Sequence, residues 1–122
     1  MINVSIIGGY LGQEPEVSTL PEGQKVARFR LCTTERGYLT RTGTQVPDRN
    51  TWHNCNLWGN LANYAPNIHK GDFVVLRGKY HTREVTDEKT GEVRTYYNFD
   101  TEEVLWTPPK PKEDAKPKKN TK

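Results

Sequence analysis

The sequence predicts an all-β domain with one short helix, and three observations support this prediction. Over residues 1–107, short runs of alternating apolar and polar residues follow one another, separated by turn residues. One segment after residue 59 replaces this alternation with apolar residues at helical spacing. The chain of 122 residues has room for one domain, so these elements should share a single core.

The first two predicted strands are residues 4–7 and 25–34. The glycine-rich turn 8–12 should end the first strand, because glycine tolerates the positive φ angles of tight turns. We expect the second strand to turn its apolar face to the core and its arginines outward. Alternation places Ala27, Phe29, Leu31 and Thr33 on one face and Val26, Arg28, Arg30 and Cys32 on the other.

Residues 35–50 form a polar connection longer than a usual hairpin loop, and we expect it to be an arm that contacts a ligand. In the strand 51–58 that follows, one face is compact and mostly apolar and should point to the core. Period two places His53, Cys55 and Leu57 on that face and Trp52, Asn54, Asn56 and Trp58 on the other. Two tryptophans on the outside of a small domain require an explanation.

A helix should start at Asn60, should be shortened or kinked by Pro66, and should end at residues 69–72. The strands 73–84 and 95–106 should form a long hairpin around residues 87–91. Three strands, a helix and two strands is the order of the OB-fold, a five-stranded Greek-key barrel with its short helix between strands 3 and 4. Such barrels bind oligonucleotides or oligosaccharides on the face of the second and third strands.

The charge distribution divides the chain into a domain, residues 1–107, and a tail, residues 108–122. The tail holds six of the 18 Lys and Arg residues and two of the 15 acidic ones, so the domain itself is close to neutral. A uniformly basic nucleic-acid-binding body is therefore excluded, and an anionic partner must meet local patches or the tail. The tail is rich in proline and lysine and should be disordered, because it cannot bury a core.

The sequence gives no positive indication of an enzyme, a metal site or a cofactor. Cys32 and Cys55 lack the spacing of a zinc or redox site, and we expect both to be small core residues. His53 should be a satisfied buried or interface histidine rather than a catalytic base. No apolar run is long enough to cross a bilayer and no signal peptide is recognisable, so we expect a cytoplasmic protein without a membrane partner.

The outward aromatic and basic residues suit single-stranded nucleic acid, in which every base offers a π face and every linkage a charge. The candidate stacking residues are Trp52, Trp58, Tyr38 and Tyr96, with Tyr80 and Tyr97 as further hairpin candidates. The candidate polar contacts are Arg28, Arg30, Arg41, Asn54, Asn56, Arg77, Lys79 and Arg83, supplemented by Arg36 and Arg94. Two alternatives remain open: another subunit could cover the tryptophans, and the arginines could form ion pairs on a solvated face.

Two stretches of the sequence resemble the bacterial single-stranded DNA-binding proteins, over about residues 1–106. They are Gly9-Tyr10-Leu11-Gly12-Gln13-Glu14-Pro15-Glu16-Val17, and Trp52-His53 followed by Leu57-Trp58-Gly59-Asn60-Leu61-Ala62. The resemblance implies an OB-fold homotetramer of two dimers that coats and protects single-stranded DNA, without sequence preference, in replication, recombination and repair. It also implies that Trp52 and Trp58 stack on bases, and it implies neither catalysis nor a cofactor.

The sequence departs from the pattern of this family in three places. Members often carry tryptophan where this chain has Tyr38 and Val85, and valine cannot stack. His81 and Glu84 stand at hairpin positions that are often basic, so contacts there should weaken or shift toward neighbouring tyrosines. The family usually ends in an acidic tip with a terminal Pro-Phe that recruits replication and repair proteins, and the basic tail 108–122 should not provide this tip.

Two other functions fit the same residues. The first is that of a dimeric relative resembling primosomal replication protein N, an OB-fold helper of helicase loading that also lacks the acidic tip. The second is an oligomeric protein-interaction scaffold that buries the tryptophans between subunits. A dimeric rather than a tetrameric mass in solution would favour the first alternative. Absence of quenching of tryptophan emission by oligonucleotides would favour the second.

Overall fold

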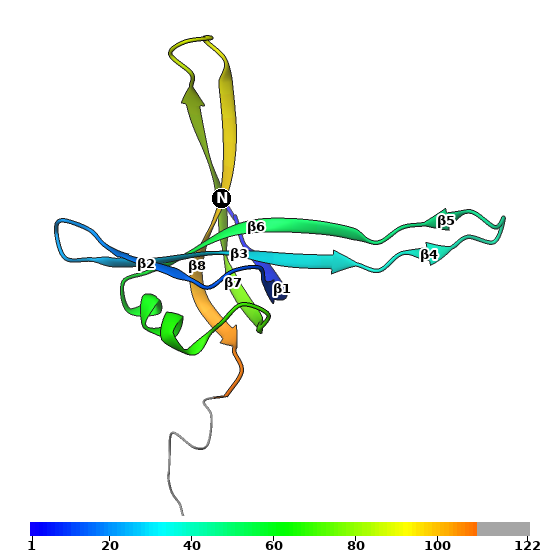
Figure 1. The fold of residues 1–122 in the computed structure, drawn as a ribbon, viewed down its shortest axis with the longest axis horizontal. Helices are drawn as coiled ribbons and strands as arrows, with labels where there is room; N and C mark the ends of the chain where they lie inside the picture. Colours follow the sequence, from blue (N-terminus) through cyan, green and yellow to red (C-terminus); the bar gives the residue numbers. More distant parts are fainter. Residues whose placement is uncertain (110–122) are drawn as a thin grey trace, which may run out of the picture.

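A computed structural model describes residues 1–109, and over this range the chain is all-β with one short 3₁₀ helix (Figure 1). From residue 110 on, the predicted disordered tail lies outside the described residues. The elements in chain order are β1 (Ser5–Leu11), β2 (Glu16–Thr19), β3 (Lys25–Glu35), β4 (Tyr38–Leu39), β5 (Gln45–Val46), β6 (Arg49–Trp58), the helix η1 (Gly59–Asn67), β7 (Phe73–Thr86) and β8 (Val93–Trp106).

Six strands form one sheet in the order β1-β7-β8-β6-β3-β2, and β1 also pairs with β3. Because β1 pairs with β7 along most of its length and with β3 at Tyr10 and Leu11, the sheet closes into a barrel. β6 and β8 pair in parallel at Cys55–Phe99 and Asn56–Asp100, and the other pairings in this sheet are antiparallel. This topology agrees with the predicted OB-fold barrel.

The start of the chain differs from the prediction in two ways. Gly8 and Gly9 lie inside β1 rather than in a turn. Gly9 is a point of close approach, because a Cβ atom built on it would lie 2.1 Å from the carbonyl oxygen of Cys32 in β3. After Pro15 the chain forms an additional strand, β2, which pairs with β3. All four residues of β2 are exposed, so no buried apolar face marks this strand in the sequence.

The core consists of the faces that alternation predicted for β3 and β6, packed against the β7–β8 hairpin. Its buried residues include Ala27, Phe29, Leu31, Cys55, Leu57, Val74, Leu76 and Phe99. Val26, expected on the outer face, is fully buried because it lies between Ser18 of β2 and Trp58 of β6. Cys32, expected in the core, is only half-buried because it lies on the outer face opposite Trp52.

The helix η1 covers the barrel on the side away from the β7–β8 hairpin (Figure 1). It buries Ala62 and Ala65 and ends at Asn67, one residue after Pro66, whose ring nitrogen cannot donate a backbone hydrogen bond. Residues 69–72, expected to end the helix, instead form the turn into β7, in which Gly71 has a φ of 90°.

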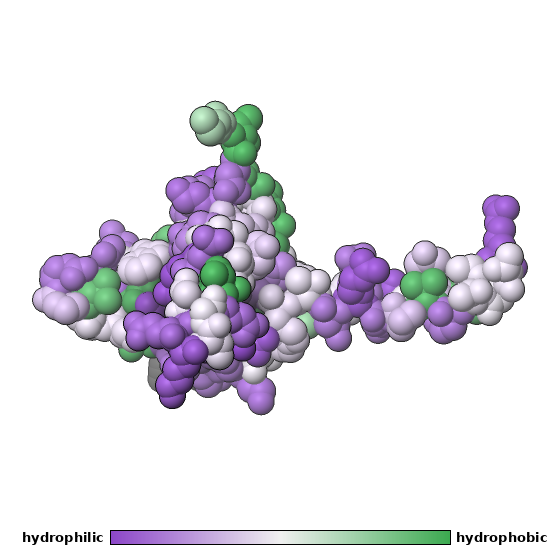
Figure 2. All heavy atoms as spheres, turned by 90° about the horizontal axis from the view of Figure 1, so that it is seen from above, coloured by the Kyte–Doolittle hydropathy of each residue, from purple (hydrophilic) through white to green (hydrophobic). Residues whose placement is uncertain are grey.

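Two long projections leave the barrel in different directions (Figure 1). One is the β7–β8 hairpin, which joins the strands expected at 73–84 and 95–106. The other is an arm formed by residues 35–50, in which β4 pairs with β5 through Tyr38–Val46 and Leu39–Gln45. Figure 2 shows that the arm extends far beyond the barrel and is mostly hydrophilic. The predicted polar connection is therefore a β arm.

The close approach at Gly9 predicts a large cost for any side chain there. We expect Gly9→Ala to lower the free energy of unfolding by about 3 kcal/mol, because the methyl group would meet the β3 backbone. Gly8→Ala is the matched control, since its methyl group would lie 3.3 Å from side-chain atoms of Phe73 and Val75, which can move. Urea denaturation of both variants measures the difference, and equal losses would contradict the close approach.

Candidate nucleic-acid interface

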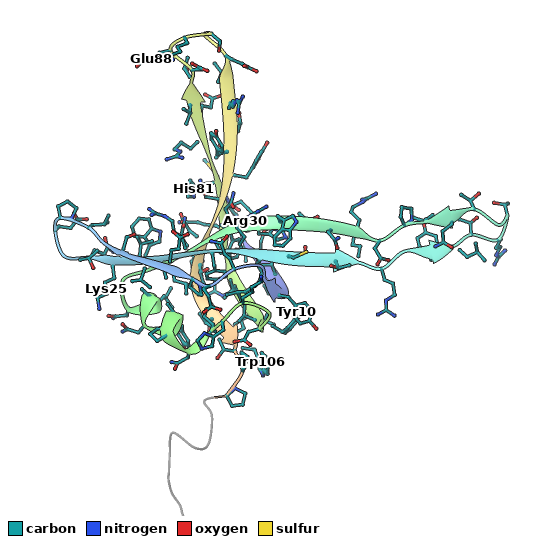
Figure 3. The ribbon with its side chains drawn as sticks, in the orientation of Figure 1. Tyr10, Lys25, Arg30, His81, Glu88 and Trp106 are labelled. Atoms are coloured by element: carbon teal, nitrogen blue, oxygen red, sulfur yellow. The ribbon has the colours of Figure 1, made fainter. Side chains whose placement is uncertain are left out.

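A groove lies between the outer face of β3 and β6 and the root of the β7–β8 hairpin, and its volume is about 680 Å³. Residues of the predicted outer face that line it are Arg28, Arg30, Asn54, Asn56 and Trp58. The hairpin contributes His81, Arg83, Asn98 and Asp100, and the start of β2 contributes Glu16. In Figure 3, Arg30 and His81 lie where the hairpin crosses β3 and β6, while Glu88 lies at the hairpin tip.

Asp100 anchors the centre of this groove. Its Oδ1 accepts hydrogen bonds from the indole Nε1 of Trp58, at 3.2 Å, and from the amide of Asn56, at 3.1 Å. Its Oδ2 lies 2.8 Å from Nδ1 of His81. The carboxylate thereby fixes the orientation of the Trp58 ring, but it also places a negative charge among the arginines.

The sequence analysis missed Asp100. Asp100 continues the alternation of Tyr96 and Asn98 along β8, so period two could have placed it on the same face as Tyr96. Its position beside Asn56 depends on the parallel pairing of β6 with β8. Such pairing between distant segments has no local sequence signal.

Trp52 lies outside the groove and is 48% exposed. The guanidinium carbon of Arg30 lies 4.6 Å from the centroid of its ring, in a cation–π contact. A Cβ atom built on Gly12 would lie 2.4 Å from Cζ3 of the ring, so the ring also packs closely against the backbone of the turn after β1. Trp52 and Trp58 are therefore both on the outside, as predicted, but only Trp58 faces the groove.

The predicted basic residues fall into three groups. Arg28, Arg30 and Arg83 line the groove, and the guanidinium of Arg83 lies 5.8 Å from the ring centroid of Tyr96, which is 41% exposed. Two others form ion pairs outside it: Arg77 with Glu102 and Glu103, and Lys79 with Glu102. The arm carries Tyr38, which is exposed, and Arg41, which lies in the turn between β4 and β5. The structure thus brings together only part of the predicted set.

His53 and Tyr80 form a polar pair at the edge of the core. The ring nitrogens of His53 lie 2.9 Å from Oγ1 of Thr33 and 2.6 Å from the hydroxyl of Tyr80. Burial lowers the pKa of His53, which favours the neutral ring and agrees with the expected satisfied histidine. The ring of Tyr80 packs edge-on against Phe99, with centroids 5.1 Å apart. Tyr80, which the sequence suggested for stacking, is therefore committed to packing.

The described residues offer no grouping of three His, Cys, Asp or Glu side chains that could hold a metal ion. Burial raises the pKa of the Cys55 thiol to about 12, so this thiol is protonated at neutral pH. In residues 1–109, no helix has the length and apolar character needed to cross a membrane.

Comparisons with known proteins agree with this architecture. The model of the single-strand binding protein family matches residues 2–106. The single-stranded DNA-binding protein of Bacteroides thetaiotaomicron is 42% identical over 88 residues, which are 71% of this chain and 55% of that protein. Single-stranded DNA-binding protein 1 of Chlorobaculum tepidum is 35% identical over 92 residues, 75% of this chain and 56% of that protein. The chain thus spans about half the length of these curated relatives.

A solved structure of the Plasmodium falciparum single-stranded DNA-binding protein in complex with single-stranded DNA is also similar. It superposes with a TM-score of 0.72 at 25% identity and covers 83% of this chain and 87% of that chain. These matches confirm the resemblance noted in the sequence and the OB-fold. The chain belongs to the single-strand binding protein family.

Proposed function

We propose that this chain binds single-stranded DNA without sequence preference, and that it coats and protects the strand during replication, recombination and repair in the cytoplasm. The observation that carries the proposal is the convergence of Arg28, Arg30 and Arg83 with the Trp58 ring on one groove. Guanidinium groups bind phosphates, and an indole face stacks on any base, so the pair recognises what all nucleotides share. Binding of this kind involves no catalytic step and no cofactor.

The charges of the groove indicate how the strand runs. Three arginines outnumber the carboxylates of Glu16 and Asp100, so the groove attracts phosphates overall. Asp100 lies against Trp58 and repels phosphates from the place beside this ring. An uncharged base can occupy that place instead. The phosphates then follow the arginines while a base stacks on Trp58.

The remaining candidates extend this surface. Asn54 and Asn56 lie on the same face of β6 as Trp58 and can hydrogen-bond the DNA, although the amide of Asn56 already donates to Asp100. Tyr38 and Arg41 on the arm are exposed and free to reach DNA outside the groove. Arg77 and Lys79 would have to release their glutamate partners before contacting phosphates, so we assign them the smallest share.

We further propose that the chain assembles into a homotetramer. An aromatic row crosses β1, β7 and β8 with ring centroids 5.2 Å apart between Tyr10 and Phe73 and 6.2 Å apart between Phe73 and Trp106. Tyr10 and Trp106 are 59% and 49% exposed, and Ile6 beside them is 62% exposed. In Figure 3, Tyr10 and Trp106 lie away from His81 and the hairpin. An apolar surface of this kind, separate from the groove, suits contacts between subunits.

Titration with oligo(dT), followed by tryptophan emission, tests the binding mechanism. We expect strong quenching, and an affinity that falls as salt is raised, because phosphate contacts release counterions. Trp52→Ala and Trp58→Ala should each weaken binding by about 1 to 3 kcal/mol, the range for one stacked base. Trp106→Phe is the control: it removes the remaining one of the chain's 3 tryptophans and should leave affinity unchanged.

The opposite result would favour the scaffold alternative. If oligonucleotides neither bind nor quench the emission, the exposed tryptophans belong to a contact between proteins. A salt-independent affinity would contradict the phosphate contacts alone.

Removing the charge of Asp100 should strengthen binding. Asp100→Asn keeps an oxygen that can accept the Trp58 hydrogen bond but removes the repulsion of nearby phosphates. We expect about fivefold higher affinity at low salt, since a pair of charges a few ångströms apart is worth about 1 kcal/mol even in water. The gain should shrink as salt screens the charge. Glu22→Gln, an equal charge change in the exposed loop before β3, should have little effect, and equal gains in both variants would contradict this role of Asp100.

Size-exclusion chromatography with light scattering measures the mass of the assembly and so tests the proposed homotetramer. We expect the mass of four chains, and a smaller mass for Tyr10→Lys, because a charge would enter the aromatic row. Tyr38→Lys makes the same change at an exposed tyrosine of the arm, and its mass should equal that of the unmodified chain. A mass of two chains for the unmodified protein would instead favour the dimeric helper of helicase loading.

A further inference from the structure

His81 is the histidine of the groove, and it lies against the carboxylate at the groove centre. It precedes Arg83 by two residues in β7, so both side chains point from the root of the hairpin into the groove. Nδ1 of its ring lies 2.8 Å from Oδ2 of Asp100, and its side chain is 47% exposed. The ring is therefore both held by the protein and open to a ligand in the groove.

The contact with Asp100 assigns a different task to each ring nitrogen of His81. A carboxylate oxygen offers only lone pairs, so Nδ1 carries a hydrogen at this distance. Within residues 1–109, no hydrogen bond or ion pair engages Nε2. This second nitrogen has a lone pair in the neutral ring and an N–H group in the protonated ring. Only the protonated ring can therefore donate to a phosphate oxygen while it keeps its contact with Asp100.

The charged groups that face His81 come from several strands. Two carboxylates favour a positive ring, those of Asp100 in β8 and Glu16 in β2, and three guanidinium groups oppose it. The arginines are Arg28, Arg30 and Arg83. The groove residues of β6 are uncharged, and Lys79 of β7 is paired with Glu102. The N-terminal segment 1–4, which bonds the hairpin through Asn3, adds no charged side chain. In the free groove, positive groups thus outnumber negative ones around the ring.

A bound strand reverses this balance. Each phosphate in the groove neutralises an arginine and adds a negative charge near the ring, which favours the protonated form of His81. Coupling between two binding events is reciprocal, so a strand that favours protonation binds more tightly once the ring is protonated. The positive ring also offsets the charge of Asp100, which otherwise repels phosphates.

We propose that His81 in its protonated form binds a phosphate of the strand through Nε2, and that DNA binding in the groove takes up a proton at this ring. The proton comes from solvent, and no covalent bond to the DNA forms. Affinity then falls as the pH rises through the range in which imidazole groups lose their proton, about pH 5 to 8. This inference rests on the proposed binding of single-stranded DNA in the groove.

Calorimetric titration with oligo(dT) tests the coupling, because thymine has no group that titrates in this range. At about pH 6.5, two buffers of different ionisation enthalpy should give different binding enthalpies, in the direction of proton uptake by the complex. The affinity should be about fivefold higher at about pH 5.5 than at about pH 8, as one additional charge contact allows. Equal enthalpies and a pH-independent affinity would overturn the inference and leave the groove as the DNA site. Absence of binding at every pH would overturn the proposed function, and the role of His81 with it.

Variants of two histidines assign the proton to one ring. His81→Gln stays uncharged, so its affinity should equal the high-pH value of the unmodified chain at every pH. His81→Arg carries a fixed charge and should keep the high affinity up to about pH 8. His69→Gln is the control, because His69 pairs with Glu14 outside the groove, and this variant should keep the pH dependence. A pH dependence that persists in His81→Gln, or is lost in His69→Gln, would overturn the inference. Equal melting temperatures at each pH exclude loss of fold as the cause of any difference.

Discussion

The antiparallel pairing of β3 with β6 is the constraint on which both the core and the groove depend. It continues along the whole of β6 without a register shift. Because side chains alternate, a slip of one residue would bring Arg28 and Arg30 into the core and expose Phe29 and Leu31. Burial of the apolar face therefore holds the outer face in its register, and the stability of the barrel and the geometry of the site have the same origin.

In the groove, the same carboxylate that orients the Trp58 ring also weakens the attraction of phosphates. Asp100 holds the indole of Trp58 through a hydrogen bond and is itself held by Asn56 and His81. A carboxylate at this place opposes the attraction of phosphates, so orienting the ring costs some of the electrostatic gain. The arrangement separates the two parts of a nucleotide, because the negative charge lies beside the stacking ring and the arginines lie along the path of the backbone.

The sequence predicted those parts of the molecule that depend on alternation within one strand. The core face of β3 and β6, the outward arginines and the outer-face positions of Trp52 and Trp58 follow from period two alone. Features that depend on pairing between distant segments could not be predicted in this way. Val26 is buried because β2 lies beside it, and Arg77 is engaged by glutamates of β8.

The same distinction separates what the sequence suggests for a residue from the contacts that the fold gives it. Tyr80 is an aromatic residue on the hairpin, as expected, but its hydroxyl and ring are engaged by His53 and Phe99, which come from two other strands. Gly9 suggested a turn, whereas its small size is needed where β1 meets β3. A residue type therefore indicates what a position can do, and contacts made by the fold decide which of those possibilities remains.

The β7–β8 hairpin gives its two faces different chemistry, and this bears on how a strand can be bound without regard to sequence. One face carries His81, Arg83 and Asp100 and contributes charge, while the other carries Tyr80 and Tyr97 and contributes rings. On the second face, the hydroxyl of Tyr80 and the side chain of Thr33 both hydrogen-bond the ring of His53. Charge on one side and ring faces on the other match the two features common to all nucleotides, and neither feature distinguishes one base from another.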